Sequence, residues 1–329
     1  MKSRVLVTGG AGYIGAHLVR FLKQQEHFVR VFDDLSSGVA SRVENVCDEL
    51  VLGTLLNVED LMKATRDIDI IYHLAAHKSV EDSVHKPLDY YITNVNGTLN
   101  LLNAMVQNHV NALVFSSSSA VYGNPAEHSV FHESNVANPI SPYGITKLVG
   151  ELCIDSVAVA NNISSISLRY FNVVGSSHFD ILDQSSFNLF PKIVSSIRSS
   201  SPFEVRGFDY PTSDGTCIRD YIHVGDVINA TYAAGEIVKK AEVHMKLNIG
   251  SGVGLSVLEI LDSFKRIKDI SLLIEKSNRR PGDPHTVIAD ISASMLTLNW
   301  RPKGNLDSII NSIFTSSTNE SRVKGQTER

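Results

Sequence analysis

A glycine-rich segment near the start of the chain constrains the fold more than any other feature. In Thr8-Gly9-Gly10-Ala11-Gly12-Tyr13-Ile14-Gly15, glycines recur at intervals of three residues. The segment follows the apolar run 4–8 and precedes an amphipathic helical pattern over 13–26. At such a junction, backbone amides and the N-terminus of the helix can bind a pyrophosphate. We therefore expect a dinucleotide-binding loop in which Gly12 lets the chain approach the phosphates.

An acidic residue lies where such a loop requires one. Asp33 is predicted at the end of the second strand, with Asp34 beside it. A carboxylate at this position accepts hydrogen bonds from the adenosine ribose hydroxyls and repels a 2′-phosphate. The pattern favours NAD over NADP. A plain strand-to-helix turn remains the alternative reading of the glycines, although it does not account for the acid.

The first half of the chain alternates between β-rich apolar runs and helical patterns. This alternation predicts a Rossmann-type doubly wound parallel sheet, and the break in rhythm after Asn172 predicts a second, smaller α/β substrate domain. We expect the domains to span 1–173 and 174–329, with a polar, flexible tail over 315–329. The expected strands lie near 4–8, 28–33, 69–75, 111–117 and 165–171, and the expected helices near 13–26, 57–66, 90–109, 143–160, 187–198, 225–240, 255–267 and 305–314.

Composition and charge exclude several classes of protein. The 329 residues carry a net charge of -5, without the basic stripe that nucleic-acid binding requires. Cys47, Cys153 and Cys217 have no CxxC spacing and no even-numbered framework, as expected in a reducing compartment. The N-terminus enters the first strand directly, and no apolar run reaches membrane-spanning length. We expect a cytoplasmic protein whose partners are small molecules, with no nucleic acid and no membrane among them.

The stretch from Tyr143 to Lys147 lies 25 residues after Ser118, on a predicted helix. Residues four apart share a helix face, so the phenol and the ammonium point into the same pocket. A free phenol has a pKa of about 10, and a fixed cation nearby favours the phenolate. A drop of roughly three units corresponds to about 4 kcal/mol, which an ammonium and a positively charged nicotinamide could supply together. The spacing predicts a tyrosine base, with a surface helix pair as the alternative.

Several motifs, taken in this order, carry a specific resemblance. They are Phe115-Ser116-Ser117-Ser118 through Val121-Tyr122-Gly123, Ser141-Pro142-Tyr143-Gly144, Arg169-Tyr170-Phe171-Asn172, Asp209-Tyr210-Pro211-Thr212 through Asp214-Gly215-Thr216, Arg219-Asp220-Tyr221-Ile222-His223-Val224, and Arg279-Arg280-Pro281-Gly282-Asp283. With the glycine loop, they make the chain similar to the UDP-glucose 4-epimerase branch of the extended short-chain dehydrogenase/reductase family, over about residues 3–312. The resemblance implies an isomerase of galactose and carbohydrate metabolism, which interconverts UDP-glucose and UDP-galactose through a 4-keto intermediate with NAD as cofactor.

The resemblance also implies three sets of site residues. The catalytic set is Ser118, Tyr143 and Lys147. The NAD-binding set is Gly9, Gly12, Tyr13, Ile14, Gly15, Asp33, Lys78, Asn94, Tyr143 and Lys147. The substrate-binding set is Ser118, Tyr143, Asn172, Asn188, Leu189, Arg219, Arg280 and Asp283.

Some positions depart from the family pattern or set its substrate range. Thr54 stands where an acid usually contacts adenine, and Arg206 stands where an aromatic residue is common and could cover the uracil face by guanidinium stacking. Val173 and Pro281 replace a proline and a glutamate away from the expected chemistry. Val287 replaces a bulky tyrosine, which leaves space beside C2 of the sugar. The resemblance therefore implies that UDP-N-acetylglucosamine and UDP-N-acetylgalactosamine are also accepted.

Particular residues bear on two alternative functions, on metal binding and on the oligomeric state. A nucleotide-sugar 4,6-dehydratase needs an acid pair after position 118, where this chain has Ser119 and Ala120. A non-catalytic NAD-binding regulator would have the fold without needing the intact trio. His73, His77 and His85 lack accompanying cysteine or acid ligands, so we expect no metal site. The helices at 90–109 and 143–160 are apolar enough to bury more than one face, and the family commonly pairs them in a homodimer.

Overall fold

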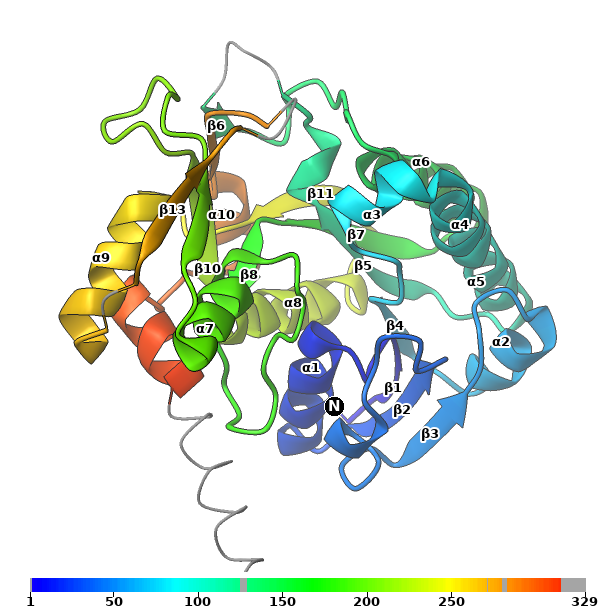
Figure 1. Ribbon diagram of the computed structural model, residues 1–329. Helices are drawn as coiled ribbons and strands as arrows, with labels where there is room; N and C mark the ends of the chain where they lie inside the picture. The colour runs from blue at the N-terminus through cyan, green and yellow to red at the C-terminus, as the bar shows by residue number, and fades with distance from the viewer. Residues whose placement is uncertain (1, 125–128, 271, 280–282, 315–329) are drawn as a thin grey trace, which may run out of the picture.

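The computed structural model describes residues 2–124, 129–270, 272–279 and 283–314 (Figure 1). The predicted tail 315–329 and Arg280 lie outside these residues. None of the helices in the described ranges is long and apolar enough to cross a membrane.

A seven-stranded parallel sheet forms the centre of the larger lobe. Its strand order is β11-β7-β5-β4-β1-β2-β3, so the order reverses between β1 and β4. This is the doubly wound Rossmann arrangement, and it confirms the predicted fold class. Ligands of such sheets bind at the carboxyl edge beside the reversal, where the glycine loop leaves β1. The strands are β1 (Arg4–Thr8), β2 (Phe28–Asp33), β3 (Glu49–Leu52), β4 (Ile70–His73), β5 (Ala112–Ser118), β7 (Ser164–Tyr170) and β11 (His244–Ile249).

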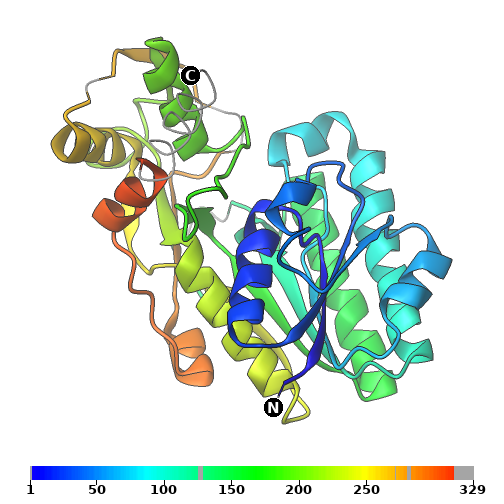
Figure 2. The ribbon, with the colours of Figure 1, turned by 90° about the horizontal axis from the view of Figure 1, so that it is seen from below.

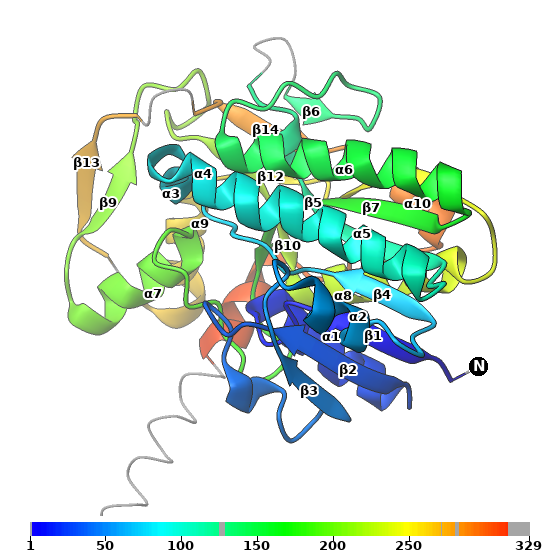
Figure 3. The ribbon, with the colours of Figure 1, turned by 90° about the vertical axis from the view of Figure 1, so that its right-hand side faces the viewer.

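Helices cover both faces of this sheet. On one face α1 contacts α8, which also lies against β5 and β7, while on the other α5 and α6 run side by side across the strands (Figure 3). Buried aliphatic side chains fill the space between the sheet and each helical layer. The helices of this lobe are α1 (Tyr13–Gln24), α2 (Val58–Ala64), α3 (Val80–His85), α4 (Pro87–Tyr90), α5 (Gly97–Gln107), α6 (Pro142–Asn161), α8 (Val224–Val238) and α10 (Ser292–Leu298).

Helix α6 starts where its capping signals require. The Ser141 hydroxyl accepts a 3.1 Å hydrogen bond from the Gly144 amide, and Pro142 occupies the first turn, where its missing N–H costs nothing. Gly150 lets the helix lie against the sheet, because a Cβ there would come within 2.9 Å of the Phe115 ring. The cap and this close approach fix the first turns of α6 beside the end of β5.

The structure differs from the prediction in one helix and in two strands of the large sheet. The helix expected over 90–109 is divided into α4, a π-helical turn η2 (Tyr91–Asn96) and α5. An extra residue in a π turn widens the helix locally, and here the turn contains Asn94, whose side chain bonds the backbone of His77. Strand β3 at the edge of the sheet was not predicted, and neither was β11. Strand β11 follows the break in rhythm, yet it pairs with β7 and extends the parallel sheet.

The smaller lobe lies beside the carboxyl edge of the sheet (Figure 2). One mixed sheet has the order β12-β10-β14-β6, with β8 also paired to β10, and β13 pairs with β9 in a separate ribbon. Because β11 and α8 pack with the larger lobe, the chain crosses between lobes more than once. The elements are β6 (Val130–Phe131), β8 (Asn172–Val174), β9 (Phe203–Arg206), β10 (Ile218–His223), β12 (Gly254–Ser256), β13 (Ile274–Ser277), β14 (Thr286–Ala289), α7 (Leu189–Ser199), α9 (Val257–Lys268) and a helix over 306–314.

Candidate active site

Three of the predicted site residues meet where β5 ends and α6 begins. Ser118 is the last residue of β5, and Tyr143 and Lys147 lie near the start of α6. The Lys147 ammonium is 5.9 Å from the centre of the Tyr143 ring, and the Ser118 hydroxyl lies close enough to the phenol to lower its pKa. The spacing in the sequence therefore corresponds to a real cluster at the carboxyl edge of the sheet.

Lys147 is held in place by the end of β5. Its side chain is buried, its ammonium donates a 2.7 Å hydrogen bond to the Ser116 carbonyl, and it lies 4.9 Å from the centre of the Phe115 ring. Burial lowers the pKa of Lys147 to about 7, while the nearby Glu151 raises it. A small change in its surroundings therefore decides whether this amine is charged at neutral pH.

The pKa of Tyr143 moves in the direction opposite to the one predicted from the sequence. Burial raises it to about 12, the hydrogen bond with Ser118 lowers it, and the neighbouring Tyr90 raises it. The charge of Lys147 favours the phenolate, as the spacing in the sequence predicts. The burial of both groups, which the spacing does not reveal, disfavours charge on each. In the polypeptide alone, ionisation of Tyr143 near neutral pH therefore requires further positive charge.

The glycine loop has the shape that a pyrophosphate cradle needs. Gly9 adopts a φ of +68°, and a Cβ there would lie 2.6 Å from the Ala75 amide nitrogen. A Cβ on Gly15 would lie 2.2 Å from the Gly9 carbonyl oxygen. By contrast, a Cβ on Gly12 would meet only that carbonyl oxygen, at 3.2 Å, among the described residues. Two glycines thus close the turn, and Gly12 caps α1 on a side that is open to a ligand.

Asp33 lies at the end of β2 as predicted and also organises the loop. One of its oxygens accepts a hydrogen bond from the Ala11 amide and the other accepts one from the Leu35 amide, each at 2.9 Å. Every carboxylate oxygen has a second acceptor site, so these bonds leave Asp33 able to accept from ribose hydroxyls. Tyr13 points elsewhere, because its buried hydroxyl donates to the Gly175 carbonyl at 2.6 Å. Ile14 packs against the core cluster beside α1.

Lys78 and Asn94 approach the site from the segment after β4. The Asn94 side chain bonds both backbone groups of His77 and donates to the Thr146 hydroxyl at 3.0 Å. Asn94 therefore joins the segment that carries Lys78 to the turn of α6 between Tyr143 and Lys147. The Lys78 ammonium lies 3.5 Å from a carboxylate oxygen of Asp183.

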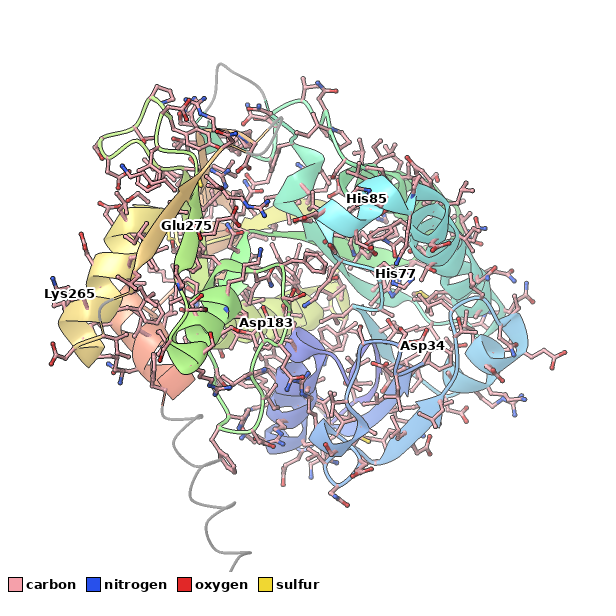
Figure 4. All side chains as sticks on the ribbon, viewed as in Figure 1. Asp34, His77, His85, Asp183, Lys265 and Glu275 are labelled. Carbon is pink, nitrogen blue, oxygen red and sulfur yellow. The ribbon has the colours of Figure 1, made fainter. Side chains whose placement is uncertain are left out.

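Asp183 is a site residue that the sequence did not reveal. It comes from the segment before α7 and lies at the boundary between the lobes, where Figure 4 labels it together with Asp34 and His77 of the larger lobe. It also accepts a 2.6 Å hydrogen bond from Asn188, the residue that caps α7. The acid has no distinctive spacing, so only the fold identifies it.

Five other residues of the predicted substrate set lie on the facing lobe. Arg219, on β10, forms a 2.6 Å ion pair with Asp283, and its side chain is mostly buried. Asn172, on β8, donates to the Asp220 carbonyl at 2.9 Å, which ties it to the neighbouring strand. Asn188 and Leu189 lie at the start of α7. Arg280, which belongs to the same predicted set, lies outside the described residues, so its placement stays a prediction.

Three of the positions singled out against the family pattern have defined surroundings, whereas Pro281 lies outside the described residues. The Thr54 hydroxyl accepts a bond from the Leu56 amide, so it forms a local turn after β3. Arg206 ends β9 and bonds the Glu204 carboxylate at 3.2 Å. Val287 lies on β14 directly opposite Arg219 of β10. Position 287 is therefore next to the residue predicted to hold phosphate.

His73 is one of the three histidines that are predicted not to bind metal. His73 is buried and bonded to the hydroxyls of Thr8 and Thr98, at 2.7 and 3.1 Å. Because Thr98 donates its proton to the Asn94 carbonyl, it accepts from the His73 ring and thereby sets the tautomer. Across the described ranges, no group of three or more His, Cys, Asp or Glu side chains could hold a metal ion.

Comparison with known proteins decides the family. The model of the NAD dependent epimerase/dehydratase family matches residues 5–250. The chain belongs to this family. It is 38% identical over 314 residues to the UDP-glucose 4-epimerase of Lactobacillus helveticus, covering 93% of this chain and 94% of the relative. As a member of the NAD dependent epimerase/dehydratase family, it is an enzyme whose cofactor is NAD.

Solved structures agree with this family over nearly the whole chain. The UDP-glucose 4-epimerase of Stenotrophomonas maltophila, solved with bound NAD and formylated UDP-arabinopyranose, superimposes with a TM-score of 0.92 at 35% identity, covering 98% of this chain and 99% of that one. The UDP-Glc/GlcNAc 4-epimerase of Campylobacter jejuni gives a TM-score of 0.83 at 33% identity, covering 96% and 99%. Both likenesses extend over the two lobes.

Proposed function

We propose that this chain interconverts UDP-glucose and UDP-galactose by C4 epimerisation through a 4-keto intermediate, with NAD as cofactor. The observation that carries the proposal is the cluster of Ser118, Tyr143 and Lys147 at the sheet edge that also bears the glycine loop. Family membership and the UDP-glucose 4-epimerase from Lactobacillus helveticus support the same reaction.

The residues of the chain divide the chemistry of the first half-reaction. When bound, NAD accepts the C4 hydride of the sugar and later returns it, and its nicotinamide adds positive charge to the site. Tyr143, as phenolate, takes the proton of the 4-hydroxyl, and Ser118 bridges that hydroxyl and the phenol. Lys147 contributes positive charge that favours the phenolate. The residues proposed to hold NAD beside this set are Gly9, Gly12, Tyr13, Ile14, Gly15, Asp33, Lys78 and Asn94.

Inversion at C4 requires the sugar to be loose while the nucleotide is fixed. The 4-keto sugar must turn over and receive the hydride on its other face, so the binding energy has to come from UDP. Arg219 suits this role because a guanidinium pairs bidentately with phosphate, and Asp283 orients it. Asn172, Asn188, Leu189 and Arg280 complete the proposed UDP site. We propose accordingly that 1–173 binds NAD and 174–329 binds the UDP-sugar, with β11 returning to the larger sheet.

The proposal also includes N-acetylated substrates and a homodimer. Val287 is small and lies opposite Arg219, which supports acceptance of N-acetylated hexosamines, and the Campylobacter jejuni neighbour is named for both sugar types. A homodimer is supported by Leu88, Leu152 and Val159 on α4 and α6, which are 71%, 57% and 64% exposed. Light scattering that gives the 36.1 kDa mass of one chain rather than twice that mass would exclude the dimer.

The cellular location and the rival activities rest on fewer residues. A cytoplasmic location is supported by Cys47, Cys153 and Cys217, which form no disulfide in the described structure. The dehydratase alternative is disfavoured because Ser119 and Ala120, which follow Ser118 in a short 3₁₀ turn, cannot supply the acid pair. A non-catalytic regulator is the alternative from another class, and membership of an enzyme family argues against it.

One incubation tests the proposed reaction. Purified protein is mixed with each UDP-hexose in turn, without added cofactor and again with NAD, and the products are separated. We expect each sugar to yield the same mixture of UDP-glucose and UDP-galactose. Loss of water to give a 4-keto-6-deoxy sugar would support the dehydratase, and no conversion in either mixture would support the regulator.

A further inference from the structure

Helix α6 contacts the end of β5 through three side chains spaced four residues apart. Tyr143 lies beside Ser118, which lowers its pKa, and Lys147 donates to the Ser116 carbonyl. One turn further along the helix, the Glu151 carboxylate accepts a 2.5 Å hydrogen bond from the Ser117 hydroxyl. The proposed chemistry uses the first two of these helix residues and assigns nothing to the third, Glu151.

Glu151 forms a buried ion pair and has no exposure to solvent. Its two carboxylate oxygens accept hydrogen bonds of 2.9 and 2.7 Å from the Arg169 guanidinium, which is itself buried on β7. Arg169 also donates to the Tyr122 hydroxyl at 3.0 Å, and Tyr122 donates to the Asn248 side chain at 2.6 Å. The carboxylate is therefore fixed by three donors and cannot turn away from α6.

Stability alone is a poor explanation for this buried pair. Removing two charges from water costs as much as their attraction returns, so an apolar pair of similar volume is often equally stable. The position of the negative charge is more informative. It lies one helical turn from a buried ammonium, at the spacing that brings side chains together on one face. In these low-dielectric surroundings, the carboxylate acts on Lys147 without a direct contact.

The other groups around Lys147 do not provide this negative charge. His73 of β4 is buried and neutral, because burial and, to a smaller extent, Lys147 lower its pKa to about 3. Arg169 faces Glu151 from β7 and is positive, while Tyr90 faces Tyr143 from α4. The carboxylate of Glu151 opposes the loss of charge that burial imposes on the amine, whose pKa would otherwise fall below about 7.

We propose that Glu151 is a positioning residue for the reaction, which keeps the Lys147 ammonium charged and in place beside Tyr143. Arg169 and Ser117 hold the carboxylate in its orientation. The inference rests on the proposed function, because it gives Glu151 a role only if the charge of Lys147 matters for turnover.

The direct test measures the charge of Lys147 itself. The holoprotein is trace-labelled with acetic anhydride between about pH 5 and about pH 11, and labelling of the Lys147 peptide is followed by mass spectrometry. In Glu151→Gln we expect the midpoint of labelling to fall by about one pH unit, because the negative charge is gone while the shape is kept. Asp155→Asn is the matched control, since Asp155 is one turn further along α6 and pairs with Lys246 on the surface. It should leave the midpoint unchanged.

A double variant and an activity profile separate charge from structure. Glu151→Gln leaves Arg169 buried without its partner, so Glu151→Gln/Arg169→Met removes both charges and keeps an acceptor for Ser117. We expect a smaller downward shift in the double variant, because losing the Arg169 charge partly offsets losing the Glu151 charge, and in each variant a matching shift of the alkaline limb of kcat for UDP-galactose. Midpoints equal to that of the parent in both variants would overturn the inference. If Lys147→Met keeps parental turnover, the proposed base pair fails as well. If Lys147→Met is inactive while the Glu151 variants titrate like the parent, only the role of Glu151 is wrong.

Discussion

The Lys147 ammonium lies 5.9 Å from the centre of the Tyr143 ring, one turn away on α6, and both groups lie where burial disfavours charge. At neutral pH Tyr143 is protonated and Lys147 is near its midpoint of titration, so the ionisation of Tyr143 depends on what else is bound. This makes the cofactor part of the electrostatics of the base as well as the acceptor of the hydride.

The ionisation of Tyr143 should therefore depend on NAD. We expect the phenol to titrate at about pH 12 in protein stripped of cofactor. With NAD bound, the added positive charge should lower the midpoint by roughly two units or more. The measurement is an ultraviolet difference titration. Subtracting the titration of Tyr143→Phe from that of the parent removes the signal of every other tyrosine. Equal midpoints with and without NAD would show that the cofactor does not influence the base.

Two glycine substitutions should separate folding from NAD binding. Gly15→Ala places a Cβ against the Gly9 carbonyl, so we expect a loss of roughly 1–3 kcal/mol of stability together with NAD binding. Gly12→Ala meets much less of the protein, so it should unfold like the parent but bind NAD about tenfold more weakly or worse. Urea unfolding and calorimetric titration with NAD measure the two effects. If Gly12→Ala binds NAD with the affinity of the parent, the pyrophosphate does not bind on this side of the loop.

Buried neutral histidines should make the protein unstable in acid. Burial lowers the pKa of His17 to about 4 and that of His73 to about 3, from an unfolded value of 6.5. Unfolding therefore takes up protons below pH 6.5, and stability falls as the pH drops through this window. Each of these histidines should lower the free energy of unfolding by about 2 kcal/mol at about pH 5 relative to about pH 8. In His17→Gln the difference in unfolding free energy between these pH values should shrink by that amount. The exposed His85→Gln is the control and should leave the difference as in the parent.

Position 287 should set the substrate range. Val287→Tyr fills the space opposite Arg219, so we expect kcat/KM for UDP-N-acetylgalactosamine to fall roughly 10- to 200-fold, with little change for UDP-galactose. Side-by-side assays with both sugars measure this ratio. A parent enzyme that turns over UDP-galactose but neither N-acetylated sugar would end the idea before the variant is made.

The parts of the fold that follow local rules were predictable. The strand, glycine loop and helix from Arg4 to Gln24 and the capped helix α6 carry their signals in adjacent residues, so both were found within a few positions. Strand β11 was missed because it joins the sheet through pairing with β7, which no neighbouring residue announces. The order of the seven strands confirms the predicted fold class, whereas the boundary at residue 173 stays a prediction.

The site shows the same limit of sequence reasoning. The spacing from Tyr143 to Lys147 was enough to bring these residues together with Ser118. It gave no information on burial, so the predicted pKa of Tyr143 had the wrong direction for the polypeptide alone. Asp183 was missed for a related reason, because its partners Lys78 and Asn188 meet it only in the folded chain.

Turnover of UDP-galactose by Tyr143→Phe tests the account most directly. The variant is loaded with NAD, its cofactor content is measured, and its rate is compared with those of the parent and of Tyr91→Phe, a tyrosine of the nearby π turn. We predict that Tyr143→Phe retains NAD and converts UDP-galactose about 10² to 10⁴ times more slowly, while Tyr91→Phe keeps the parental rate. A near-parental rate in NAD-loaded Tyr143→Phe would contradict the assignment of Tyr143 as the base.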